Sequence, residues 1–94
     1  MNRDAYLEKA KAQLDEWNAD LDKLEAKSRG AKADAKIKYD EQLTALRQRR
    51  DKAKQKFAEI QSASEDAWES LKQGAEDAWN SLKEAVTKAK SQFD

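Results

Sequence analysis

The most restrictive feature of the sequence is an apolar side chain at every third or fourth position along most of its length. Near the N-terminus the steps alternate strictly between three and four, the heptad pattern of a helix that packs through one seam. The residues of this seam are Leu7, Ala10, Leu14, Trp17, Leu21 and Leu24. The stripe continues with smaller side chains as far as Ile60, so the pattern predicts helix through the first part of the chain.

From Phe57 onward the apolar period becomes eleven, and the segment EDAWESLK at residues 65–72 returns as EDAWNSLK at residues 76–83. Eleven residues in three turns is close to the pitch of an unstrained helix. Trp68 and Trp79 therefore fall on one side of a nearly straight helix, about 16 Å apart. A row of small residues runs beside them: Ala63, Ala67, Gly74, Ala78, Ala85 and Ala89. We expect this broad face to contact two neighbouring helices.

Helix-breaking residues are scarce, since the chain has no Pro and only two Gly. Ser62, followed three residues later by Glu65, matches a capping box and predicts a helix start. The stripe keeps its phase across Gly30, which favours an unbroken helix there. We therefore predict an all-α, elongated coiled coil in a single domain (1–94), with a long helix over about 3–61 and an amphipathic helix over about 65–92.

The alternative is a three-helix bundle with an extra turn near Gly30. Its helices would cover about 3–28, 32–61 and 65–92. Lys27 and Arg29 would suit the last turn of the first helix, with the glycine just beyond its end.

The net charge of zero conceals three blocks of alternating sign. Residues 1–26 carry 4 basic and 7 acidic groups, residues 27–56 carry 11 and 4, and residues 57–94 carry 4 and 8. The blocks therefore have net charges of −3, +7 and −4. We predict that the basic block pairs with the acidic blocks, within a chain or between chains.

The residue types present predict no catalytic, cofactor-binding or metal-binding residue. The chain contains neither His nor Cys, and it lacks the glycine-rich loops that hold phosphates. We therefore expect a protein that is not an enzyme and has no cofactor and no small-molecule substrate. The charged start lacks a secretory signal, and no apolar run is long enough to span a membrane, so a cytoplasmic protein is expected.

Two segments raise the question of outside partners. The basic run RQRRDKAKQK at residues 47–56 could bind nucleic acid, but the balance of the charge blocks favours pairing with the acidic segments. The amphipathic last helix could lie on a membrane or envelope surface. Packing against other helices is the more common role of such a stripe, so membrane binding is the alternative function.

Two segments also carry a resemblance to a known family: KAQLDEWNADLDKLEAK at residues 11–27 and SEDAWESLKQGAEDAWNSLKEA at residues 64–85. The chain resembles, over nearly its whole length, a family of small bacterial coiled-coil proteins described as stress-response proteins. The resemblance implies a helical, non-enzymatic protein with a role in stress response, and it brings no catalytic residue.

We therefore predict a self-associating coiled-coil protein whose partner is itself, as a homo-oligomer or an extended assembly. The heptad seam and the 11-residue (hendecad) seam would supply the contacts. The predicted interface residues are Leu14, Trp17, Leu21, Leu24, Leu46, Phe57, Ile60, Trp68, Leu71, Trp79, Leu82 and Val86.

Overall fold

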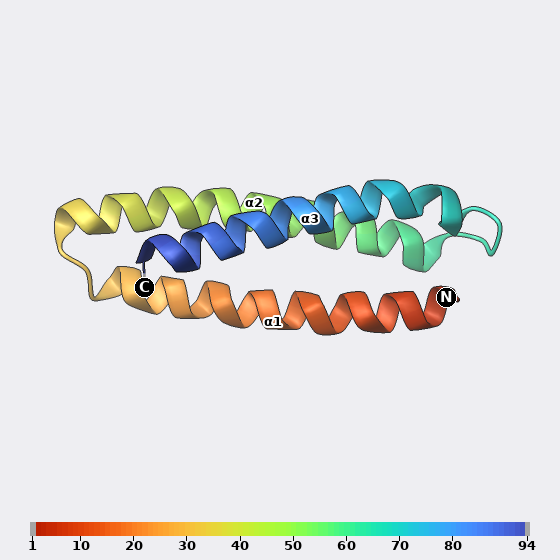
Figure 1. Ribbon diagram of the computed structural model, residues 1–94, viewed down its shortest axis with the longest axis horizontal. Helices are drawn as coiled ribbons and strands as arrows, with labels where there is room; N and C mark the ends of the chain where they lie inside the picture. The colour runs from red at the N-terminus through yellow and green to blue at the C-terminus, as the bar shows by residue number, and fades with distance from the viewer. Residues whose placement is uncertain (1, 94) are drawn as a thin grey trace.

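The computed structural model describes residues 2–93, which form an elongated bundle of three helices (Figure 1). The helices are α1 (Arg3–Arg29), α2 (Ala33–Ser62) and α3 (Trp68–Phe93). Helix α2 runs antiparallel to both others, so α1 and α3 point the same way and begin at the same end of the bundle (Figure 1). The bundle measures 51 × 19 × 17 Å. The all-α prediction is confirmed, and the three-helix bundle is the correct arrangement.

The long helix predicted over about 3–61 is wrong, because α1 ends at Arg29 and α2 begins at Ala33. Gly30 itself keeps helical angles, with φ −90° and ψ 0°. The chain leaves the helical path at Lys32, whose φ of −67° and ψ of 159° are extended. This turn therefore does not use the left-handed conformation for which glycine is usually selected after a helix.

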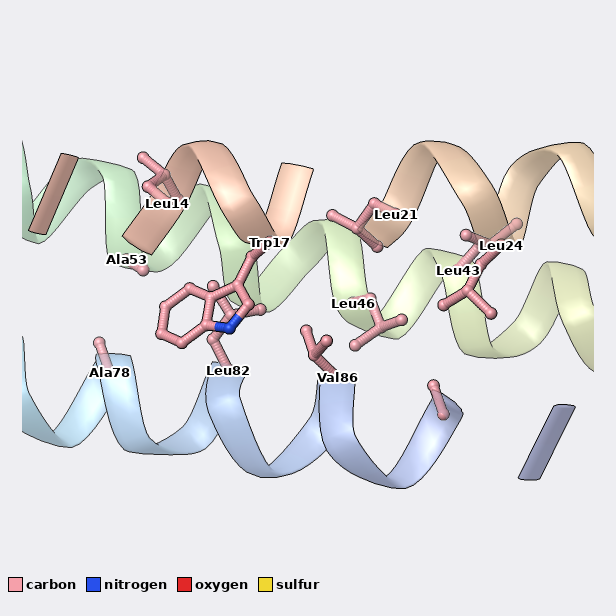
Figure 2. Close-up of a cluster of buried hydrophobic side chains, with 11 residues drawn as sticks. Leu14, Trp17, Leu21, Leu24, Leu43, Leu46, Ala53, Ala78, Leu82 and Val86 are labelled. Carbon is pink, nitrogen blue, oxygen red and sulfur yellow. The ribbon is translucent and has the colours of Figure 1, made fainter. Parts of the chain in front are cut away.

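Contacts across the first turn explain why the chain reverses although the apolar stripe keeps its phase. The Ala31 N–H donates to the Ser28 carbonyl at 3.1 Å, which closes the turn. The Ser28 hydroxyl, which is buried, donates to the Asp40 carboxylate at 2.9 Å and ties α1 to α2. Beyond this link, Leu24 and Leu43 approach each other from the two helices (Figure 2). Folding back buries two apolar seams against each other, which one straight helix cannot do within a single chain.

The second turn lies where the sequence predicts it, but a different serine caps the helix. The Ser62 hydroxyl donates to the Ala58 carbonyl at 2.6 Å, in the last turn of α2. The Ser64 hydroxyl accepts from the Ala67 N–H at 3.2 Å, and the Ser64 carbonyl accepts from the Ala67 and Trp68 N–H groups. The capping role predicted for Ser62 therefore belongs to Ser64.

The core runs along α2, which is covered by α1 on one flank and α3 on the other. Leu46, Ile60 and Leu82 are its most completely enclosed large side chains, each 1% exposed or less. Trp17 extends from α1 toward α3, where its ring lies beside Leu82 (Figure 2). The other buried apolar residues are Leu14, Leu21, Leu24, Leu43, Ala53, Trp68, Ala75, Ala78, Val86 and Ala89.

Charge pairing between the helices is sparser than the block pattern predicts. Within residues 47–56, Arg47 reaches another helix, with its guanidinium 3.2 Å from the Glu25 carboxylate of α1. Arg49 instead donates to the carbonyl and the hydroxyl of Ser81, at 3.2 and 3.0 Å. Among residues 2–93, one ion pair therefore joins the basic run to an acidic helix. Burial of apolar side chains, rather than matching of charges, accounts for most of the packing.

The capping assignment can be tested with a matched pair of variants. Ser64→Ala removes the hydroxyl that accepts at the start of α3, so it should lower the free energy of unfolding by about 0.5–2 kcal/mol. Ser62→Ala removes only an exposed hydroxyl that donates to its own helix, and should change it by less than about 0.5 kcal/mol. Urea denaturation followed by circular dichroism measures both. A larger loss from Ser62→Ala would contradict the assignment.

Candidate functional site

A groove of about 380 Å³ runs between α1 and α3, with α2 as its floor. We call it the α1/α3 groove. It lies toward the end of the bundle at which α1 and α3 begin. These two helices contact each other less extensively than either contacts α2, which leaves the space between them open. Its lining residues are Tyr6, Leu7, Lys9, Ala10, Gln13, Phe57, Ile60, Lys72, Ala75, Glu76, Trp79 and Asn80.

The groove is hollow because small side chains line its walls where larger ones would have closed it. Ala10 contributes to the α1 wall and Ala75 to the α3 wall. Phe57 and Ile60 form the floor from α2, and Phe57 is only half-buried. A half-buried aromatic ring beneath an open groove is apolar surface that a further binding partner could cover.

A pair of aromatic rings packs beside one end of the groove. The rings of Tyr6 and Trp68 lie 5.9 Å apart between centroids, in a tilted arrangement. The Lys72 ammonium lies 5.6 Å from the centroid of Tyr6 and 6.0 Å from that of Trp68. Both distances are within the range of cation–π attraction, which holds this lysine beside the groove. The pair also joins the first turns of α1 and α3.

Trp79 connects the groove to the core. Its ring lies 6.0 Å from that of Trp17, between centroids, also tilted. Trp79 is half-buried, whereas Trp68, one 11-residue repeat earlier, is buried. The repeat therefore places its two tryptophans in different environments, and the second one contributes to the groove wall.

Charged groups of both signs edge the groove: Lys9 from α1, and Lys72 and Glu76 from α3. Burial raises the pKa of the Tyr6 phenol above its usual value of 10.0, and the nearby Glu76 carboxylate raises it further. Both effects disfavour the phenolate, so Tyr6 is a neutral hydroxyl at neutral pH. The groove thus combines an apolar interior with a mixed-charge rim, a composition typical of surfaces that bind proteins.

Most residues that the sequence predicted as an interface lie inside the bundle of a single chain. Those that are buried are Leu14, Trp17, Leu21, Leu24, Leu46, Ile60, Trp68, Leu82 and Val86. Phe57, Leu71 and Trp79 are half-buried. Phe57, Ile60 and Trp79 come together in the α1/α3 groove, and the others are distributed along the core or beside it.

Sequence reasoning did not select Tyr6, Leu7 or Lys72 for the interface, although all three line the groove. Leu7 could have been found, because it begins the heptad seam. Nothing in the local sequence distinguishes Tyr6 or Lys72, since their roles depend on the folding of α3 beside α1.

Comparison of the chain with protein-family models, curated proteins and solved structures finds no match. Within residues 2–93, no group of three or more His, Cys, Asp or Glu side chains is placed to hold a metal ion. None of the described helices has the length and apolarity that a membrane crossing requires.

The raised pKa of Tyr6 predicts a loss of stability at alkaline pH. A neutral phenol is favoured in the folded chain, so the stabilisation is fully present below the unfolded pKa of about 10. It is lost as the pH rises through the higher folded value. Tyr6→Phe should therefore lose less stability than the wild type between about pH 9 and about pH 11. Urea midpoints measured at both pH values test this, and equal losses in the two proteins would count against it.

Proposed function

We propose that this chain is a non-enzymatic helical protein that self-associates, with a second copy seated on the α1/α3 groove. The observation that carries the proposal is the groove itself, an apolar hollow that the chain's own side chains leave open. Most residues of the seams that the sequence suggested for assembly are buried inside the bundle of one chain. The groove is the part of these seams that remains accessible, and in it Phe57 and Trp79 are half-buried.

The charges of the rim support a second copy as the occupant. In a two-fold dimer the same surface faces itself, so it must be complementary to itself. A rim with Lys9 on α1 and Glu76 on α3 meets this requirement, because the two-fold axis can set each lysine against the glutamate of the other copy. A rim of one sign would repel its own copy.

The size of the bundle is also sufficient for a stable contact. Its long face measures 51 × 19 Å, and stable interfaces bury about 800 Å² on each partner. In the dimer, α1 and α3 of both copies would lie together as four helices around a shared apolar seam. The resemblance to bacterial stress-response proteins supports a role in stress response and a cytoplasmic location as part of this proposal.

Membrane binding through α3 is the alternative role. The apolar face that would meet lipid includes Trp68, Leu82 and Val86, which are all buried in the bundle. Binding a membrane with this face would require α3 to leave the bundle and would expose the core. Self-association through a groove that is already open requires no such rearrangement, and we favour it for that reason.

A matched pair of charge insertions tests the dimer. Leu7→Glu places a carboxylate in the groove and should give the mass of one chain by light scattering at concentrations where the wild type is a dimer. Ile37→Glu makes a similar change at a side chain that is 60% exposed and outside the groove, so it should leave the mass unchanged. A wild-type protein that stays monomeric at high concentration would contradict the proposal.

Charge exchange tests the pairing across the two-fold axis. Lys9→Glu should weaken the dimer about tenfold, because it sets like charges against each other in two symmetry-related places. Adding Glu76→Lys in the same chain should restore the dimer. Lys11→Glu, at an exposed lysine of α1 outside the groove, is the control. Equal weakening by Lys9→Glu and Lys11→Glu, measured by sedimentation equilibrium, would indicate a general charge effect and refute the pairing.

A further inference from the structure

A second hollow, of about 300 Å³, lies between α2 and α3 and is independent of the α1/α3 groove. Arg49, Lys52 and Lys56 line it from α2, at spacings of three and four residues that place them along one face of the helix. On α3 it is lined by Gly74, Asp77, Ala78 and Ser81. We call it the basic hollow. The small residues of α3 leave room beneath the long basic side chains of α2.

The cations of the basic hollow are not neutralised by the acidic helix beside them. Within residues 2–93, neither Arg49 nor Lys52 has a carboxylate within ion-pair distance. Lys56 pairs with Glu59 of its own helix at 3.5 Å. Asp77, the acidic residue of the lining, accepts from the Gln73 side chain at 3.1 Å. Three cations and one carboxylate leave the hollow with an excess of positive charge.

Arg49 is held in place by α3. Both of its hydrogen bonds, to the Ser81 carbonyl at 3.2 Å and to the Ser81 hydroxyl at 3.0 Å, come from Nη1. A guanidinium has five N–H donors, so those on Nη2 and Nε remain for a ligand. A fixed guanidinium loses little freedom when it binds an oxyanion, and it can donate two parallel hydrogen bonds to a phosphate.

We infer that the basic hollow binds a soluble oligophosphate, such as pyrophosphate or the phosphate chain of a nucleotide. The excess positive charge favours an anion with several charges. Arg49 and Lys56 are seven residues apart, about 10 Å along the helix, so linked phosphates suit the site better than one phosphate. Gly74 adds no side chain to the hollow, and a Cβ at this position would lie 4.0 Å from the Lys56 ammonium, at ordinary contact distance.

Titration of the full chain with pyrophosphate, in a low-salt buffer free of phosphate, tests the inference by calorimetry. The wild type should bind saturably. Arg49→Gln should weaken binding about tenfold or more, because it removes charge-assisted hydrogen bonds. Lys38→Gln removes one charge from an exposed position on the same helix, outside the hollow, and should change affinity by less than about twofold. Circular dichroism confirms that each variant is folded.

The Gly74→Leu variant distinguishes a binding site with a defined shape from a surface that is only positively charged. It fills the space between the helices without changing any charge and should abolish pyrophosphate binding. Unchanged binding by this variant would overturn the inference, as would equal weakening by Arg49→Gln and Lys38→Gln. Absence of saturable binding at millimolar pyrophosphate would also overturn it, even if the protein floated with vesicles containing phosphatidic acid.

Discussion

The apolar side chains of α2 are covered from two directions, by α1 along one flank and by α3 along the other, and the rest of the structure depends on this burial. Fully burying a side chain such as Leu46, Ile60 or Leu82 contributes about 1.5–3 kcal/mol. No disulfide can assist, because the chain has no cysteine. At Ala53 and Ala89, which are completely buried, short side chains let the helices approach closely.

Much of this arrangement could be predicted from the sequence, because the period of the apolar residues identifies both the helices and the faces that they bury. The first turn could not be assigned in this way. The stripe runs through Gly30 in phase, and Gly30 keeps helical angles in the folded chain. The choice between a rod and a hairpin depends on tertiary burial, such as that of Leu24 near Leu43, which a local pattern does not contain.

Two smaller differences between the sequence-based prediction and the structure also arise because a local pattern does not contain tertiary packing. Glu65 follows Ser62 by three residues and Ser64 by one, so the sequence allows either serine to cap the helix. Only the path of the turn determines that the Ser64 hydroxyl accepts from the Ala67 N–H. The charge blocks correctly suggest that α2 lies beside acidic segments. Exposed ion pairs, however, contribute only about 0–1 kcal/mol each, so the packing of the helices determines where the charged side chains lie. Arg49, for example, donates to Ser81 rather than to a carboxylate.

The two candidate sites lie on the two flanks of α3, where the packing of the core leaves space. Toward α1, small residues and half-buried aromatic rings leave an apolar groove. Toward α2, small residues lie beneath Arg49, Lys52 and Lys56, none of which forms an ion pair with a carboxylate of α3 among residues 2–93. The row of small residues read from the sequence contributes Gly74 and Ala78 to this second hollow. The basic residues on the α2 side of this hollow could not be assigned to it from the sequence, because the register of α2 against α3 is a property of the folded bundle.

The distance between the start of α1 and the end of α2 tests the central claim most directly. The chain has no cysteine, so Ala5→Cys and Ala58→Cys, both at exposed positions, can be spin-labelled cleanly. Dilution with an excess of unlabelled protein restricts the measurement to pairs within one chain. The bundle predicts a short distance, set by its 19 × 17 Å cross-section and the label linkers. A distance near 80 Å, the length of 53 residues of unbroken helix at about 1.5 Å each, would contradict it.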